Sequence, residues 1–215
     1  MKKVKKKKFH IALFMLVVFV LWTIAVRFID VRAIGPQEST VGFATINQLV
    51  HNLTGVNMSL YTITDWLGIV PFCFVIGFGA LGLVQLIKRK NLLMVDYSIL
   101  VLGGFYIVTM AVYVFFEMFI INYRPILIKG ILEASYPSST TMLVMCVMPT
   151  AIMQFNASIK NNVLKRCVAT AITAFIVFMV IGRVVSGVHW FTDIVGGALL
   201  SAGLVMMYRS INDLK

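Results

Sequence analysis

The stretch that decides the fold is "CVATAITAFIVFMVIGRVVSGVHWFTDIVGGALLSAGLVMMY", residues 167–208. It consists of two apolar runs joined by a short polar segment, and each run is long enough to cross the hydrocarbon core of a bilayer as a helix. The joining segment contains Ser186-Gly187, a pair that favours a break between helices. We therefore expect two membrane-spanning helices that meet at a polar turn.

The rest of the chain repeats this pattern. Of its 215 residues, 60% are hydrophobic and 13% are charged, and the mean hydropathy is +0.94. A soluble domain would carry more charge, and the apolar runs are continuous, whereas a half-buried strand would alternate. The sequence predicts an all-α, polytopic membrane protein, with a basic N-terminus (1–8) and a single membrane domain (9–215). Its six spans are expected at about 9–29, 65–87, 97–122, 139–156, 166–185 and 190–209.

The net charge of +11 is unevenly distributed. Six lysines in "MKKVKKKK" directly precede the first apolar run, as in a cytoplasmic, lipid-facing N-terminus. With this end inside, most Lys and Arg residues of the loops fall on the inner side. We therefore expect an integral protein of the cell membrane with both termini cytoplasmic, and no nucleic-acid partner. A cleaved signal peptide fits less well because the first apolar run is long and no cleavage site follows it.

The outer segment between the first two spans includes "ESTVGFATINQLVHNLTG", residues 38–55. Ser39 or Thr40 would cap the start of a helix here, and Gly55 would end it. An amphipathic helix lying on the outer membrane interface is predicted. It either borders a site or serves only as a connector. Its apolar residues recur at helical spacing: Phe43, Ile46, Leu49, Val50 and Leu53.

Three ionisable residues cluster around the polar turn: Arg183, His189 and Asp193. Charged groups at membrane depth are costly and often functional. Residues four apart on a helix share a face, so Asp193 is expected to reach His189. Such a carboxylate would fix the imidazole tautomer and leave the other ring nitrogen free. On these residues alone, interfacial anchoring by Arg183 and a His-Trp pair is the simpler interpretation.

The outer loop before the fourth span changes this balance. It reads "NYRPILIKGILEASYPSSTTM", residues 122–142, with Arg124 near its start. Small hydroxyl residues at a helix N-terminus, here Ser138, Ser139 and Thr140, present unpaired backbone N–H groups that bind anions. Arginine forks suit phosphate oxygens. The sequence therefore predicts a phosphate pocket on the outer face, with His189 as nucleophile or general base.

These residues resemble the type 2 phosphatidic acid phosphatases, membrane lipid phosphatases related to the vanadium haloperoxidases. The third motif of that family is Ser-Arg, five residues, His, three residues, Asp. It matches Arg183, His189 and Asp193, with Gly182 in place of the leading serine. Motif order, spacing and the six-span topology agree over about residues 65–210.

The resemblance implies a role for each matching residue. His189 would attack phosphorus and form a phospho-histidine that water resolves, and Asp193 would orient it. The phosphoryl oxygens would be held by Arg124, Arg183 and the backbone of Ser138 and Ser139. The implied substrate is a lipid phosphate or an isoprenyl phosphate or diphosphate among the membrane lipids. No metal and no cofactor are implied.

Three further positions depart from the family pattern. Glu117 stands where the first motif has a phosphate-binding lysine, seven residues before Arg124. In the second motif, Pro-Ser-Gly-His, Ser139 replaces the glycine and Thr140 replaces the histidine that protonates the leaving group. Glu117 and Arg124 are two helical turns apart, so a direct or networked ion pair between them is feasible.

Three hypotheses follow from these departures. The chain could be a phosphatase with altered acid catalysis, in which Glu117 donates the proton or a diphosphate substrate needs less protonation. It could transfer a phosphoryl or head group between lipids. It could also be a non-catalytic relative that binds or carries a lipid phosphate. The retained nucleophile, aspartate and arginines favour an enzyme.

Overall fold

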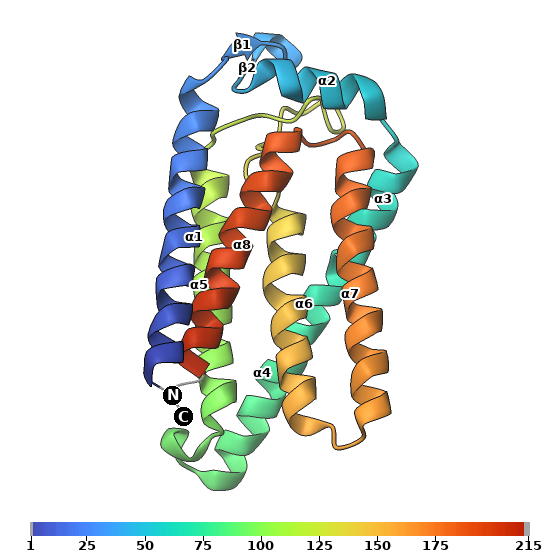
Figure 1. Cartoon of the computed structure of the whole chain (residues 1–215). Helices are drawn as coiled ribbons and strands as arrows, with labels where there is room; N and C mark the ends of the chain where they lie inside the picture. Colours follow the sequence, from blue (N-terminus) through green and yellow to red (C-terminus); the bar gives the residue numbers. More distant parts are fainter. Residues whose placement is uncertain (1, 213–215) are drawn as a thin grey trace.

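The computed structural model of the chain describes residues 2–212. Long helices stand side by side as a bundle, and a short helix, α2, lies across one end (Figure 1). A two-residue antiparallel pair of strands, β1 (Arg32–Ala33) and β2 (Thr40–Val41), precedes α2. The helices described are α1 (Lys2–Phe28), α2 (Ala44–Thr54), α3 (Met58–Leu67), α4 (Ile69–Arg89), α5 (Tyr97–Met118), α6 (Ser139–Ser158), α7 (Asn162–Val185) and α8 (Phe191–Asn212), with 3-10 turns η1 (Pro36–Glu38) and η2 (Leu92–Met94).

Six segments within residues 2–212 are long and apolar enough to cross a membrane, which confirms the all-α, six-span prediction. The second span differs from its expected limits because α3 leads into α4 at Gly68, so that it begins at Met58. The third ends at Met118, before the predicted residue 122. The spans are Lys6–Phe28, Met58–Arg89, Tyr97–Met118, Ser139–Ser158, Asn162–Val185 and Phe191–Asn212.

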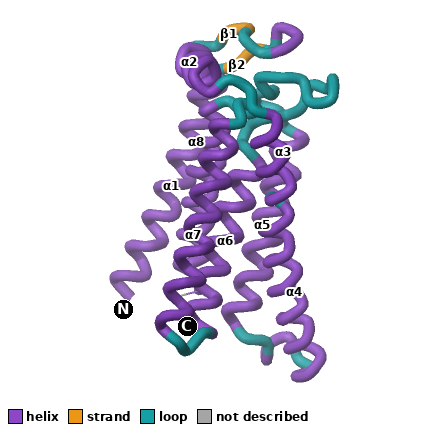
Figure 2. Tube along the Cα trace, turned by 90° about the vertical axis from the view of Figure 1, so that its right-hand side faces the viewer, coloured by secondary structure: helices purple, strands orange, loops and turns teal. Residues whose placement is uncertain are grey.

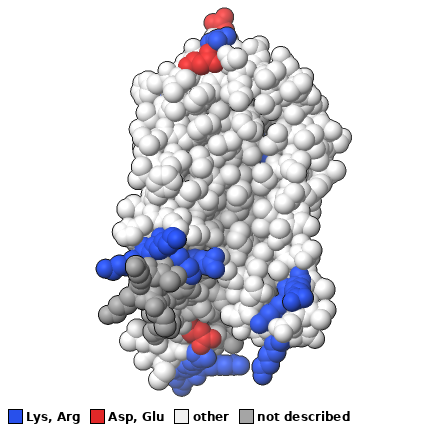
Figure 3. Space-filling model, in the orientation of Figure 1, with Lys and Arg blue, Asp and Glu red and all other residues white. Residues whose placement is uncertain are grey.

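The distribution of side chains is that of a membrane protein. Helices α6 and α8 form the interior, with 56% and 50% of their most apolar stretches buried, compared with 6% for Met58–Arg89. Large apolar side chains such as Phe14 and Ile76 are exposed on the outside of the bundle. Figure 3 shows Lys and Arg gathered at the end opposite α2, below a broad belt without charge. Such a belt fits the hydrocarbon region of a bilayer.

Tyr136 fixes the loop between α5 and α6 to the core of the bundle. Its ring stacks on Phe19 of α1, and its hydroxyl lies 2.7 Å from Thr23 Oγ1. A Cβ at Gly196 of α8 would lie 2.6 Å from the Tyr136 ring, so only glycine allows this approach. The loop is therefore held at the end of the bundle that also carries α2, as Figure 2 shows.

The predicted amphipathic helix is present as α2, but its start was predicted wrongly. Residue Phe43 precedes it in a left-handed conformation and makes no side-chain capping bond, whereas Ser39 and Thr40 lie before it in a turn and in β2. Its end at Gly55, with φ of 63°, is as predicted. The start differs because the short strand pair fixes the point at which the chain enters α2. The helical periodicity of the sequence does not indicate such a constraint.

Helix α2 is attached to the bundle by a buried amide. Asn47 Nδ2 donates to Thr192 Oγ1 (2.9 Å), and Asn47 Oδ1 accepts from Thr192 N–H (3.1 Å). In contrast, Leu49 and Leu53 on the other face of α2 are exposed. The helix therefore binds the start of α8 with a polar group and turns apolar residues outward.

Candidate active site

The polar turn between α7 and α8 has the predicted break. Helix α7 ends at Val185, and Gly187 adopts a φ of 66°. A Cβ at Gly187 would lie 1.8 Å from the Gly55 carbonyl oxygen, so the close approach of these two segments requires glycine. The Asn57 N–H donates to the Ser186 carbonyl (3.0 Å). The segment after α2 thus holds the turn that carries His189.

The loop between α5 and α6 folds back on itself through a two-residue turn. Ile128 and Ile131 exchange both backbone hydrogen bonds, at 3.0 and 2.9 Å. The residues between them, Lys129 and Gly130, have φ of 51° and 78°. Two consecutive positive φ angles are typical of the tight turn that closes a β-hairpin. The two arms of this loop therefore lie antiparallel.

This pairing brings four polar residues together. Arg124 N–H donates to the Glu133 carbonyl (3.0 Å), and Ser135 N–H donates to the Asn122 carbonyl (2.9 Å). Residues that face each other in such a pair have neighbouring side chains. Residues separated by nine and thirteen positions in the sequence thus meet beside His189.

His189 and Asp193 meet, but not by the direct bond that the sequence predicted. Their nearest polar atoms, Nδ1 and Oδ2, are 4.0 Å apart. The Ser135 hydroxyl lies between them, 3.0 Å from His189 Nδ1 and 2.5 Å from Asp193 Oδ2. The prediction was wrong because His189 precedes the first residue of α8, Phe191, so the spacing of four is not helical.

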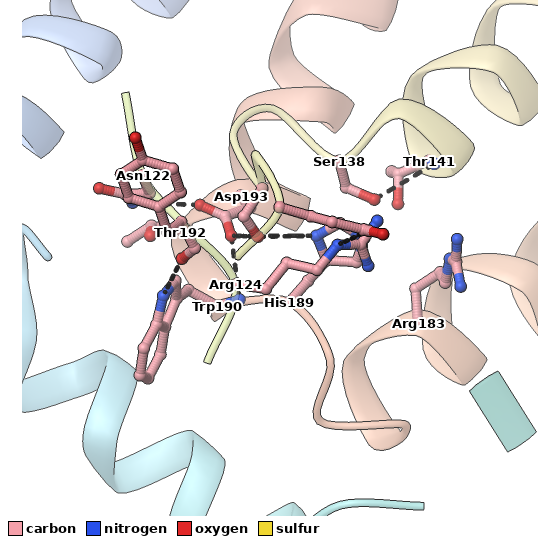
Figure 4. Close-up of polar contacts among 12 residues, drawn as sticks. Asn122, Arg124, Ser138, Thr141, Arg183, His189, Trp190, Thr192 and Asp193 are labelled. Atoms are coloured by element: carbon pink, nitrogen blue, oxygen red, sulfur yellow. Dashed lines mark hydrogen bonds and ion pairs between the residues drawn. The ribbon is translucent and has the colours of Figure 1, made fainter. Parts of the chain in front are cut away.

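The Asp193 carboxylate is completely buried and held by three donors. Besides the Ser135 hydroxyl, Asn122 Nδ2 donates to Oδ1 (3.2 Å) and the Trp190 N–H donates to Oδ2 (3.0 Å). A buried carboxylate without such partners would be strongly destabilising. Figure 4 shows Asn122 and Asp193 on one side of His189.

These contacts select the tautomer of His189. The hydroxyl proton of Ser135 is directed at Asp193, so His189 Nδ1 must donate to Ser135 Oγ, and Nε2 carries the lone pair. Arg124 Nη1 lies 3.3 Å from Nε2. Burial, followed by the charges of Arg124 and Arg183, lowers the pKa of His189 well below its ordinary value. The imidazole is therefore neutral near pH 7.

Arg124 pairs with a carboxylate that the sequence analysis did not single out. Its Nε is 3.1 Å from Glu133 Oε2, so the proposed direct pairing with Glu117 is wrong. Glu117 lies in the last turn of α5, where it is exposed, and lines a small pocket together with His189 and Ser139. Arg124 pairs with Glu133 and not with Glu117 because the hairpin-like loop places Glu133 beside it.

Arg183 lies across the site from Asp193 and is almost completely buried (Figure 4). Its guanidinium contacts the hydroxyl of Thr140 and lies 3.3 Å from Asp65 Oδ1. It also stacks over the Tyr61 ring at 5.1 Å, and Arg124 approaches the same ring at 5.9 Å. The two arginines thus face one ring from α3.

The start of α6 lies at the site, as predicted. The backbone N–H of Ser138, however, was predicted to hold a phosphoryl oxygen and is bonded within the protein instead. The Ser138 N–H donates to the Asp193 carbonyl (3.0 Å), and its side chain caps α6 by accepting from Thr141 N–H. The next two N–H groups, of Ser139 and Thr140, have no acceptor within the helix. These two are the backbone donors that an anion would meet.

A family model described as the PAP2 superfamily matches residues 99–214. This chain belongs to the PAP2 superfamily. Membership supports the chemistry of a membrane lipid phosphatase at the level of the family. The matched segment contains Arg124, Arg183, His189 and Asp193 but excludes α2 and α3.

The fold agrees with a solved PAP2 protein. The crystal structure of a transmembrane PAP2-type phosphatidylglycerolphosphate phosphatase from Bacillus subtilis is similar, with a TM-score of 0.58 and 18% sequence identity over 93% of each chain. No curated protein sequence matches the chain significantly.

Sequence reasoning missed Asn122, Glu133, Ser135 and Asp65. The first three lie in the loop between α5 and α6, where no periodicity indicates the direction of a side chain. A Lys-Gly turn flanked by isoleucines was an available hairpin signal. Asp65 carried a signal too, as a carboxylate at the start of an apolar span.

Proposed function

We propose that this PAP2 protein releases phosphate from a lipid diphosphate or lipid phosphate through a phospho-histidine at His189. The observation that carries the proposal is the orientation of the imidazole. Its Nδ1 is bound to Ser135, its Nε2 lone pair points away from that bond, and two buried arginines lie beside it. A neutral, oriented imidazole next to fixed positive charge is suited to attack phosphorus.

The reaction has two steps. His189 Nε2 forms a bond to phosphorus while the bond from phosphorus to the leaving oxygen breaks, and the positive charge on the imidazole is stabilised by Ser135 and Asp193. Water then attacks phosphorus, the P–N bond breaks, and phosphate leaves. Arg124, Arg183 and the N–H groups of Ser139 and Thr140 stabilise the phosphoryl oxygens in both steps.

Protonation of the leaving oxygen distinguishes the possible substrates. The Thr140 hydroxyl, at the position of the family's acid, contacts Arg183 and is too weak an acid to protonate an alkoxide. Glu117 lines the pocket beside His189 and is the group placed to donate that proton. A diphosphate needs less help, since its leaving group is itself a phosphate. Lipid diphosphates are therefore the favoured substrates.

The site is proposed to face the outside of the cell membrane, with both termini in the cytoplasm. Lys and Arg concentrate at the end of the bundle opposite the site, as Figure 3 shows. Positive residues favour the cytoplasmic side of a membrane. A cysteine introduced at Lys129, which is exposed at the turn of the loop between α5 and α6, should then react with an impermeant reagent added to intact cells, and reaction only after permeabilisation would reverse this orientation.

Phosphate release by the purified full-length protein tests the chemistry. With a lipid diphosphate labelled in its terminal phosphate, the wild type should release label and, after a rapid quench, carry it on His189. The variant His189→Asn should lose both signals. His51→Asn is a matched control. His51 lies at the same end of the bundle, with its ring 5.6 Å from that of Trp190, but it is not part of the group formed by His189, Ser135 and Asp193. Turnover that persists in His189→Asn would refute the mechanism.

One observation favours a second candidate, a lipid-phosphate-binding protein without turnover. Asp65 and Thr140 already occupy the Arg183 guanidinium, so a bound phosphate must compete with them. This candidate predicts binding of a lipid diphosphate with neither phosphate release nor label on His189. Measured binding with no trapped label would therefore decide in its favour.

A further inference from the structure

The guanidinium of Arg183 is buried but incompletely bonded. Its Nη2 contacts the Thr140 hydroxyl and lies 3.3 Å from Asp65 Oδ1, and its Nη1 lies 3.5 Å from the Thr64 hydroxyl. Its Nε is buried and has no hydrogen-bond partner within residues 2–212. Bonds between arginine and a carboxylate are usually about 2.7–2.9 Å long and often come in parallel pairs. The contact with Asp65 is single and long, so Arg183 keeps the capacity to bind another anion.

The two members of this ion pair differ in their freedom to move. The Arg183 side chain is 2% exposed, and its guanidinium stacks over the Tyr61 ring at 5.1 Å. The Asp65 side chain is 56% exposed and lines a hollow of about 290 Å³. Its neighbour Trp66 is 73% exposed, and tryptophan favours the headgroup level of a membrane. An anion that enters the site would therefore displace the aspartate and leave the arginine in place.

Gly182, one residue before Arg183, allows α3 to approach α7 closely, and the two helices lie side by side in Figure 1. A Cβ at Gly182 would lie 2.7 Å from Thr64 Cγ2. The threonine side chain has little freedom to turn away because it is β-branched. Glycine, which stands here in place of the serine of the family motif, therefore permits the approach that brings Asp65 to Arg183.

The residues that contact the two arginines from α3 do not belong to the family motifs. Tyr61 and Asp65 are four residues apart inside a helix, so they share one face of α3. That face meets the guanidinium groups of both Arg124 and Arg183. Helix α3 precedes the segment matched by the family model, residues 99–214. The contact of Asp65 is therefore a feature of this chain that the motifs do not describe.

We propose that Asp65 is an exchangeable counter-ion of Arg183. It occupies the arginine in the empty site, gives way to the phosphoryl group when substrate binds, and returns as phosphate leaves. The proposal rests on the proposed function and concerns the control of phosphate affinity at the same site. Because one ionic contact of Arg183 is broken for each one made, phosphate binds less tightly than it would to a free arginine. Asp65 thus promotes release of the product.

The direction of the effect at Asp65 separates exchange from a structural role. Asp65→Asn keeps the shape of the side chain and removes the competing charge. Affinity of the purified full-length protein for radiolabelled inorganic phosphate, measured by equilibrium dialysis, should rise about tenfold, which corresponds to about 1.4 kcal/mol. Asp65→Glu, which keeps a carboxylate, should stay within about threefold of wild type. If Asp65 served only to hold Arg183 in place, Asp65→Asn would weaken binding. Weaker or unchanged binding would overturn the proposal.

Two controls separate direct exchange from a distant effect of charge. Glu38→Gln removes an exposed negative charge at the same end of the bundle and should leave phosphate affinity within about twofold. The dialysis is also repeated at high salt, since the screening length falls from about 10 Å at 0.1 M to about 3 Å at 1 M. The ratio between Asp65→Asn and wild type should persist at 1 M. Its disappearance would assign the effect to charge at a distance and overturn the exchange.

A second variant tests the approach of α3 independently. Gly182→Ser adds atoms against Thr64 and should move Asp65 away from Arg183, so phosphate affinity should rise, by less than in Asp65→Asn. In the double variant, the serine should add nothing to the effect of Asp65→Asn, because both changes remove the same contact. An equal gain from the serine with and without Asp65 would overturn the role of the aspartate.

Turnover distinguishes this proposal from the proposed function. With a lipid diphosphate, Asp65→Asn should lower both KM and the inhibition constant of phosphate without raising kcat. Tighter phosphate binding in Asp65→Asn, with no phosphate release by the wild type, would retain the counter-ion and reject the phosphatase. Phosphate release by the wild type, with unchanged phosphate affinity in Asp65→Asn, would retain the phosphatase and reject the counter-ion.

Discussion

The candidate active site has two walls that differ in burial and hydrogen bonding. We call them the finished wall, whose side chains are buried and bonded to one another, and the open wall, whose side chains are exposed or partly buried. On one wall, His189, Ser135, Asp193 and Asn122 are all buried, and each is bonded to another member of the group. On the other wall Glu117 is exposed, and Ser139 and Thr140 are only partly buried. His189, the proposed nucleophile, is therefore held in place by contacts within the protein, whereas the side proposed for the leaving group is more open.

The largest expected effect is on the finished wall, with Asp193→Asn. The side chain keeps its shape, but its amide nitrogen replaces one of two acceptor oxygens, so that one of the three surrounding donors faces another donor. We expect kcat to fall by about 10⁴, the loss seen when an orienting aspartate is neutralised. Phosphate release measures it, with Asp96→Asn, at the opposite end beside Arg89, as the control. A loss of less than about tenfold would show that the buried carboxylate does not orient His189.

The open wall should show an effect that depends on the substrate. With Glu117→Gln, hydrolysis of a lipid monophosphate should slow by about 10²-fold, because general acid catalysis contributes 10²–10⁴. Hydrolysis of the matching lipid diphosphate should change by less than about threefold. Glu38→Gln, in η1, serves as the control for loss of a negative charge. Equal losses on the two substrates would assign Glu117 a part in binding and none in proton transfer.

A smaller effect is expected at Ser135, which joins His189 to Asp193 on the finished wall. Ser135→Ala should lower kcat by about 10- to 100-fold, as for other groups that orient a reactive imidazole. The effect is limited because His189 Nδ1 and Asp193 Oδ2 are only 4.0 Å apart and can approach each other. Ser135→Thr should restore most of the rate. Ser201→Ala, which removes a buried hydroxyl of α8 away from the site, should be neutral in kcat.

The smallest expected effect is a displacement of the pH profile. Protonated imidazole has no lone pair, so kcat/KM is lost as the pH falls through the pKa of His189. Burial and the neighbouring arginines lower this pKa, so the acidic limb should lie below the ordinary value of 6.5. A limb at or above 6.5 in the wild type would mean that His189 is neither as buried nor as close to positive charge as in the structure.

The sequence predicted the elements that follow from hydrophobic periodicity and little that depends on loops. Six continuous apolar runs were sufficient for the spans, and Ser186-Gly187 was sufficient for the turn at the site. The direct contact between Asp193 and His189 was mispredicted because a spacing of four indicates contact only inside a helix. Ser135 and Glu133 were missed because their direction depends on the fold of the loop between α5 and α6, which Tyr136 attaches to the bundle.

The bond between Asn47 and Thr192 ties the candidate active site to a part of the chain far from its motifs. Thr192 is the residue next to Asp193, and Gly55 packs against Gly187 two residues before His189. Both supporting contacts come from residues that precede the segment matched by the family model, 99–214. A fragment cut to that segment would keep every motif residue yet lose the contacts from α2 and Gly55 that support the turn carrying His189. The part of the chain that supports the candidate site is therefore longer than the segment that the family model matches.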